Sequence, residues 1–110
     1  MAEDTYTALV DAQTKLTEAD RLLGVGHRQE AYANFLMASS ALFNTSKFSY
    51  CRDAGLLANR LGSDVIGKLV ISLLDGGALC WQPQRDRIKA RSAALVVDLG
   101  RLVEQYAPPE

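Results

Sequence analysis

The feature that most constrains this chain is a glycine followed by small and aromatic residues at helical spacing. Gly26, Ala31, Phe35 and Ala38 read G-x4-A-x3-F-x2-A at the start of an amphipathic segment. Small residues let two helices approach closely where they cross, and the aromatic side chain fills the space one turn later. Gly24 and Gly26 also favour a sharp reversal, because glycine readily adopts the left-handed conformation that ends helices. The spacing therefore predicts an antiparallel helical hairpin.

The composition is that of a globular protein with one domain. The 110 residues are 48% hydrophobic and 23% charged, far from the composition of disordered chains. The net charge of −1 argues against a general attraction to nucleic acid or to anionic membranes. The first residues are acidic, and the longest apolar run, residues 69–74, is too short to span a bilayer. We therefore expect a single domain over residues 1–110, located in the cytoplasm.

Apolar periodicity predicts an all-α fold of five antiparallel helices. The first helix, over residues 5–23, carries a narrow apolar seam that consists of Leu9, Ala12, Leu16, Ala19 and Leu23. The fifth helix, which begins at Trp81 or Pro83, carries a heptad seam that consists of Ile88, Ser92, Leu95, Leu99, Leu102 and Tyr106. We expect both seams to be packing surfaces.

The second expected helix, over residues 28–44, has two packing faces. One face consists of Tyr32, Phe35, Leu36, Ser39, Leu42 and Phe43, and an adjoining face consists of Ala31, Ala38 and Ala41. The third helix is expected to begin near Ser46 or Ser49 and to end at Gly62. Ser63 then reads as the N-cap of a fourth helix over residues 64–74. A β-hairpin formed by residues 69–74 and 78–82 is an alternative, although the first of these runs lacks polar alternation.

The first hairpin resembles a tetratricopeptide repeat. Its G-x4-A-x3-F-x2-A spacing matches the consensus of the second repeat helix, and Ala19 lies where that family keeps a small residue. Gly55, Gly62, Gly67 and Ile71 give a fainter copy, 36 residues after Ala19, Gly26, Ala31 and Phe35. The resemblance implies two degenerate repeats followed by a C-terminal capping helix. The hairpin is also similar to MIT domains, three-helix modules that bind short helical peptides.

In a tetratricopeptide array, the first helices of successive hairpins line a groove for a partner helix or an extended peptide. The resemblance places eight residues in that groove: Gln13, Leu16, Asp20 and Leu23 on the first helix, and Arg52, Leu56, Asn59 and Arg60 on the third. Arg52 and Arg60 are suited to holding a carboxylate. The expected function is therefore a non-enzymatic adaptor or protein-interaction module.

The sequence contains no pattern that indicates a catalytic site, a metal or a cofactor. His27 is the only histidine and lies in an expected turn, so a catalytic pair with Cys51 has no support from the spacing. Cys51 and Cys80 lack the spacing of redox or zinc sites, and we expect both to be buried free thiols. We expect neither an enzyme nor a metal-binding protein.

A run of cations occupies the first two turns of the last helix. Each cation there interacts unfavourably with the helix dipole, at a cost of about 0.3–1 kcal/mol. The run consists of Arg85, Arg87, Lys89 and Arg91. One explanation is neutralisation by acidic residues of the first helix, namely Glu3, Asp4, Asp11, Glu18 and Asp20. The other is an anionic partner. That explanation favours an alternative function, a small homodimeric regulator or phage-type inhibitor. Such a protein would pair the seams of its first and last helices between subunits and bind an anionic protein or nucleic acid through the cations.

Overall fold

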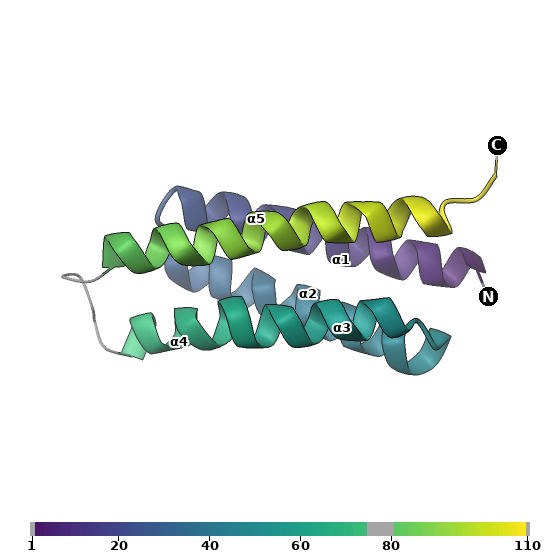
Figure 1. Ribbon diagram of the computed structural model, residues 1–110, viewed down its shortest axis with the longest axis horizontal. Helices are drawn as coiled ribbons and strands as arrows, with labels where there is room; N and C mark the ends of the chain where they lie inside the picture. The colour runs from purple at the N-terminus through teal and green to yellow at the C-terminus, as the bar shows by residue number, and fades with distance from the viewer. Residues whose placement is uncertain (1, 75–80, 110) are drawn as a thin grey trace.

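The computed structural model describes residues 2–74 and 81–109, which form four antiparallel helices (Figure 1). In chain order the elements are α1 (Ala2–Gly24), α2 (Arg28–Ser49), α3 (Arg52–Leu61), the π-helical segment η1 (Gly62–Ile66), α4 (Gly67–Leu74) and α5 (Trp81–Tyr106). Because α3, η1 and α4 follow one another without a break, they form the third helix of the bundle. The predicted all-α class is confirmed, with four helices in place of the five expected.

The four helices form a ring in which each packs beside its neighbour along the chain, and α5 closes the ring against α1. α1 and α3 therefore lie at opposite corners of the bundle. The molecule measures 49 × 24 × 18 Å because all four helices run along one axis. A tetratricopeptide array requires the first helices of its two hairpins to be neighbours, so this ring order does not form the expected groove.

The turn between α1 and α2 ends α1 as the glycines predict. Gly26 has a φ of +88°, in the left-handed region. The Gly26 amide donates to the Leu23 carbonyl at 3.2 Å, and the His27 amide donates to the Leu22 carbonyl at 2.9 Å. These two bonds satisfy carbonyls that the helix end leaves without partners, as in a Schellman motif.

The break expected at Gly62 is wrong. Gly62 has right-handed helical angles, and its carbonyl accepts a bond from the Gly67 amide, five residues on, which is the π-helical pattern. Ser63 does not cap a new helix, because its hydroxyl donates to the Asn59 carbonyl one turn back at 3.1 Å. The chain therefore passes through the serine without leaving the helix. The hairpin alternative is also wrong for residues 69–74, which are helical, while residues 78–80 lie outside the described part.

The turn between α2 and α3 lies later than the sequence predicts. α2 continues to Ser49, so Ser46 and Ser49 lie inside α2 and do not begin the next helix. Tyr50 reverses the chain in the left-handed conformation, with φ +53°, and Cys51 precedes α3 in an extended conformation. The helices are close at this end, since a Cβ added to Gly55 would lie 2.5 Å from the Ser46 Oγ.

The core confirms the predicted seams. The α1 seam is fully buried, and so are Ala31, Phe35 and Ala38 of the G-x4-A-x3-F-x2-A pattern. The α5 seam is buried from Ile88 to Leu102, and Tyr106 packs against its end. One prediction about packing is only half realised. On the α2 face predicted to start at Tyr32, Phe35 and Leu42 are buried in the core, whereas Leu36 and Phe43 are exposed.

Candidate functional site

Two of the four expected groove residues on the first helix are buried, and the other two lie against α5. Leu16 and Leu23 are buried in the core and therefore present no surface to a partner. Asp20 accepts a bond from the Lys89 Nζ at 2.7 Å, and Gln13 lies beside Gly100 of α5. Leu16 and Leu23 therefore serve the core, and Asp20 and Gln13 lie next to α5.

The third-helix half of the expected groove is exposed but divided between two sides of α3. Arg52, Leu56 and Asn59 are exposed and follow one another at steps of four and three, which places them on one face of the helix. Arg60 belongs to another side, because its Nη1 donates to the Asp98 Oδ2 of α5 at 2.8 Å. Only the first three residues share a surface that a partner can reach.

An apolar surface runs along the outer side of α2. Leu36, Met37, Phe43 and Phe48 are exposed on this helix, and Phe43 retains 58% of its accessible area. Residues 31–46 contain no charged side chain. A solvent-facing helix in a water-soluble fold normally carries charges on its outer side. The outer surface of α2 is therefore a candidate interface.

The basic run of the last helix is mostly neutralised within the chain, but chiefly by residues outside α1. Lys89 pairs with Asp20 of α1, as one of the two explanations predicts. Arg85 lies 3.5 Å from Asp86 on its own helix, and Arg91 lies 3.7 Å from Asp64 of η1. Glu18 pairs within α1 with Arg21, whose hydrogen bond lowers the pKa of the Glu18 carboxyl. The side chains of Glu3 and Asp4 lie outside the described part.

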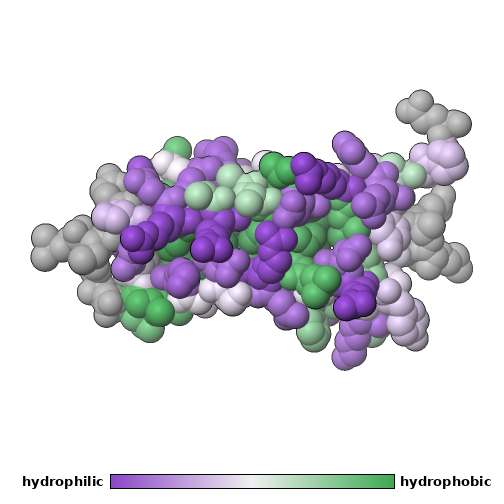
Figure 2. All heavy atoms as spheres, viewed as in Figure 1, coloured by the Kyte–Doolittle hydropathy of each residue, from purple (hydrophilic) through white to green (hydrophobic). Residues whose placement is uncertain are grey.

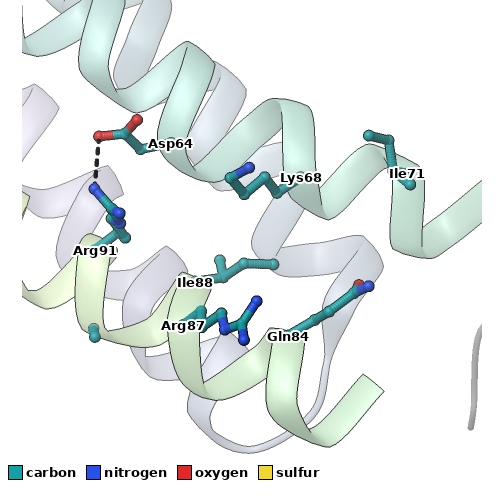
Figure 3. A pocket seen from close by; sticks show the side chains of 8 residues that line it. Asp64, Lys68, Ile71, Gln84, Arg87, Ile88 and Arg91 are labelled. Carbon is teal, nitrogen blue, oxygen red and sulfur yellow. Dashed lines mark ion pairs between the residues drawn. The ribbon is translucent and has the colours of Figure 1, made fainter. Parts of the chain in front are cut away.

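A cleft of about 490 Å³ separates η1 and α4 from the first half of α5 (Figure 3). It is lined by Asp64, Lys68, Ile71, Gln84, Arg87, Ile88, Ala90 and Arg91. Figure 3 shows Arg91 reaching from α5 to Asp64 and Ile88 pointing toward α4. Hydrophilic side chains gather over this end of the molecule, with a hydrophobic patch at the end of α4 (Figure 2). The basic run identifies one wall of this cleft from sequence. Lys68, on the other wall, was missed because no spacing links it to Arg87.

His27 and Cys51, the two residues considered for a catalytic pair, are far apart. His27 lies at the start of α2, 3.2 Å from Glu30, and Cys51 lies beyond its end, so the 22-residue helix separates them. Cys51 is buried and free, as predicted, while Cys80 lies outside the described residues. A hydrogen bond with the Cys51 thiol raises the pKa of Tyr106, and burial adds to the effect. Among the described residues, no group of three or more side chains is arranged to hold a metal ion.

No protein family, curated protein or solved structure matches the chain. The resemblances to tetratricopeptide repeats and to MIT domains therefore remain predictions from residue spacing. Within the part of the chain that the structure describes, no helix is long and apolar enough to cross a membrane.

Proposed function

We propose that the protein is a non-enzymatic interaction module that binds an amphipathic helix of a partner protein on the outer face of α2. The observation that carries this proposal is the uncharged stretch of residues 31–46, on which Leu36, Met37 and Phe43 are exposed. Large exposed apolar patches on soluble proteins mark interaction surfaces, and the centres of interfaces are depleted of charged residues.

The spacing of this surface suits a helical partner. Tyr32, Leu36, Ser39 and Phe43 follow steps of four, three and four, which is the heptad spacing of a helix-packing seam. Tyr32 and Ser39 are half-buried. Leu36, which lies between them, and Phe43, which follows them, are exposed. A partner helix that packs on this seam would bury Leu36 and Phe43 in an environment like the core of a coiled coil.

The neighbouring helix supplies a border for the same surface. α3 packs beside α2 and exposes Arg52, Leu56 and Asn59 on one face. Polar residues around an apolar centre are the usual composition of an interface rim. Three of the eight residues expected to contact a partner thus retain that role in the proposal.

The alternative function, a homodimer paired through the seams of α1 and α5, is not supported by the burial of these seams. Leu9 and Leu16 of α1, and Leu95 and Leu99 of α5, lie in the core of a single chain. Pairing between subunits would require the bundle to open.

The proposal is tested first by cross-linking in the cells that produce the protein. A photoreactive amino acid replaces Leu36 in one version of the full chain and Arg101, exposed on α5, in a second. We expect a protein that is joined at position 36 and not at position 101. The absence of such a product would contradict the proposal.

The second step uses the cross-linked protein in purified form. We expect Phe43→Ser to weaken its binding at least tenfold, because truncation of a central aromatic residue at an interface costs about 2 kcal/mol or more. Val97→Ser is the matched control, since Val97 is 53% exposed on α5 and lies away from α2. Equal binding by both variants would overturn the proposal. A dimer of the purified chain that Phe43→Ser dissociates would identify a second copy as the occupant and equally contradict it.

A further inference from the structure

Two cations, Lys68 and Arg87, line opposite walls of the cleft between α4 and α5. Asp64 and Arg91 form an ion pair across the cleft at 3.7 Å, which places these two residues at the same level of the two antiparallel walls. Lys68 lies one turn after Asp64, and Arg87 lies one turn before Arg91, so these two residues occupy the next level of the cleft. Neither has an ion-pair partner among the described residues.

The next turn of the cleft carries Ile71 on the α4 wall and Gln84 on the α5 wall. Ile71 lies three residues beyond Lys68 and is 55% exposed, while the buried Ile88 forms the floor next to Arg87. A site that holds a negative group at one level and an apolar group at the next selects an amphiphilic ligand. The volume of the cleft falls in the range of small-molecule pockets, roughly 300–1,000 Å³.

The length of the cleft also favours a small molecule over a partner helix. Its two walls run from Asp64 to Ile71 and from Gln84 to Arg91. At 1.5 Å per residue, each wall extends for only about 10 Å, or two helical turns. We propose that this cleft, independently of the α2 surface, binds a small organic anion. Its carboxylate or phosphate group lies between Lys68 and Arg87, and its short apolar chain lies over Ile71 and Ile88.

The proposal is tested by titrating the purified full chain with octanoate and with octyl phosphate, followed by calorimetry or by amide NMR shifts. Octanol supplies the apolar chain without a charge, and inorganic phosphate supplies the charge without a chain. We expect at least one of the two amphiphilic anions to bind more tightly than either of these controls. Preference between octanoate and octyl phosphate identifies the head group. Binding of inorganic phosphate or octanol as tight as that of both amphiphiles, or no saturable binding at all, would overturn the proposal.

Two matched pairs of variants place the ligand in the cleft. Arg87→Gln is expected to weaken binding about tenfold, as for the loss of one hydrogen bond to a charged group. Arg101→Gln removes an equally exposed cation from the same helix and is expected to leave binding unchanged. Asp64→Asn frees Arg91 and is expected to tighten binding, whereas Asp98→Asn frees Arg60 outside the cleft and is expected to have no such effect. Equal effects within either pair would contradict the assignment. Lys68→Gln provides a second test of the anion site if Arg87→Gln lowers the melting temperature.

Discussion

At the scale of single residues, Tyr50 is a position at which glycine should stabilise the protein. It is 91% exposed and has a left-handed backbone, which costs a residue other than glycine roughly 1–2 kcal/mol. Glycine removes that strain but has a larger entropy to lose on folding, about 0.5–1 kcal/mol. We therefore expect Tyr50→Gly to raise the free energy of unfolding by about 0.5–1 kcal/mol, measured by urea denaturation.

Val25 is the matched control for Tyr50. It is also exposed and lies in the turn between α1 and α2, but its φ is negative. Val25→Gly should therefore lower the free energy of unfolding by about 0.5–1 kcal/mol, since it adds only the entropic cost. The same sign for both substitutions would mean that Tyr50 is not strained.

Tyr106 gives the stability a dependence on alkaline pH. Its hydrogen bond with the Cys51 thiol raises its pKa, so the folded state holds the phenol proton more tightly than the unfolded state does. The resulting stabilisation is complete below the unfolded pKa, about 10, and is lost as the pH rises through the folded pKa. We expect wild type to have a higher free energy of unfolding than Tyr106→Phe at pH 8. That difference should shrink above pH 10 in urea unfolding. A difference that grows with pH would exclude this hydrogen bond.

At the scale of elements, Gly62 distinguishes a continuous third helix from two separate helices. Its backbone is right-handed, and an added Cβ would meet no atom within 4 Å. Gly62→Ala should therefore raise the free energy of unfolding by about 0.5–1 kcal/mol through helix propensity. A helix that ended at Gly62 in the left-handed conformation would instead be destabilised by the same change.

Two other glycines calibrate that measurement. Gly26→Ala should destabilise the protein by about 1–2 kcal/mol, because Gly26 has a positive φ. Gly67→Ala should raise the free energy of unfolding less than Gly62→Ala does, since a Cβ at position 67 would lie 3.2 Å from the Gly62 carbonyl oxygen. Thermal unfolding of the three variants gives their order directly. If Gly62→Ala lowered the melting temperature as much as Gly26→Ala does, a continuous helix through Gly62 would be contradicted.

The elements that could be predicted from sequence are those with an uninterrupted apolar seam. The seams of α1 and α5 fix which side of each helix is buried, and both predictions are confirmed. The ends of α2 and the continuity of the third helix could not be predicted in the same way. Ser46, Ser49 and Ser63 all resemble helix caps in sequence, but each lies inside a helix. A serine hydroxyl can bond either to an amide ahead of it or to a carbonyl behind it, and only the surrounding fold decides between them.

At the scale of the whole molecule, the ring order could not be predicted because helix seams do not identify their partners. The candidate cleft is a consequence of that order, since η1 and α4 meet the first half of α5 only when α5 closes the ring. Sequence spacing identified Arg87 and Arg91 but not the opposing wall. The cleft combines residues from two antiparallel helices, and their register is set by packing across the bundle.

The ion pair between Asp20 and Lys89 joins α1 to α5 and therefore tests whether α5 closes the ring. The Asp20 Oδ1 atom is buried without a hydrogen-bond partner among the described residues. The carboxylate is therefore stabilised mainly by the ion pair of its Oδ2 atom with Lys89. We expect Lys89→Met to cost about 1–3 kcal/mol by leaving the carboxylate unpaired. Asp20→Asn should recover part of that loss in the double variant. A double-mutant cycle in urea should give a coupling energy of about 1 kcal/mol.

The control for this cycle is Glu18 and Arg21, an exposed pair within α1. We expect no measurable coupling there, since exposed ion pairs contribute little. A zero coupling for Asp20 and Lys89 as well would place α5 away from α1 and would contradict the ring.

The ring also determines the order in which the chain can assemble. Three of its four contacts join helices that are consecutive in sequence, so they need only a short stretch of chain to close. Topologies dominated by such local contacts fold in microseconds to milliseconds. The contact of α1 with α5 joins the two ends of the chain and carries the largest closure entropy. We therefore expect formation of this contact to limit the folding rate. Substitutions at the α1–α5 contact should therefore change the folding rate more than substitutions in the α1–α2 hairpin do.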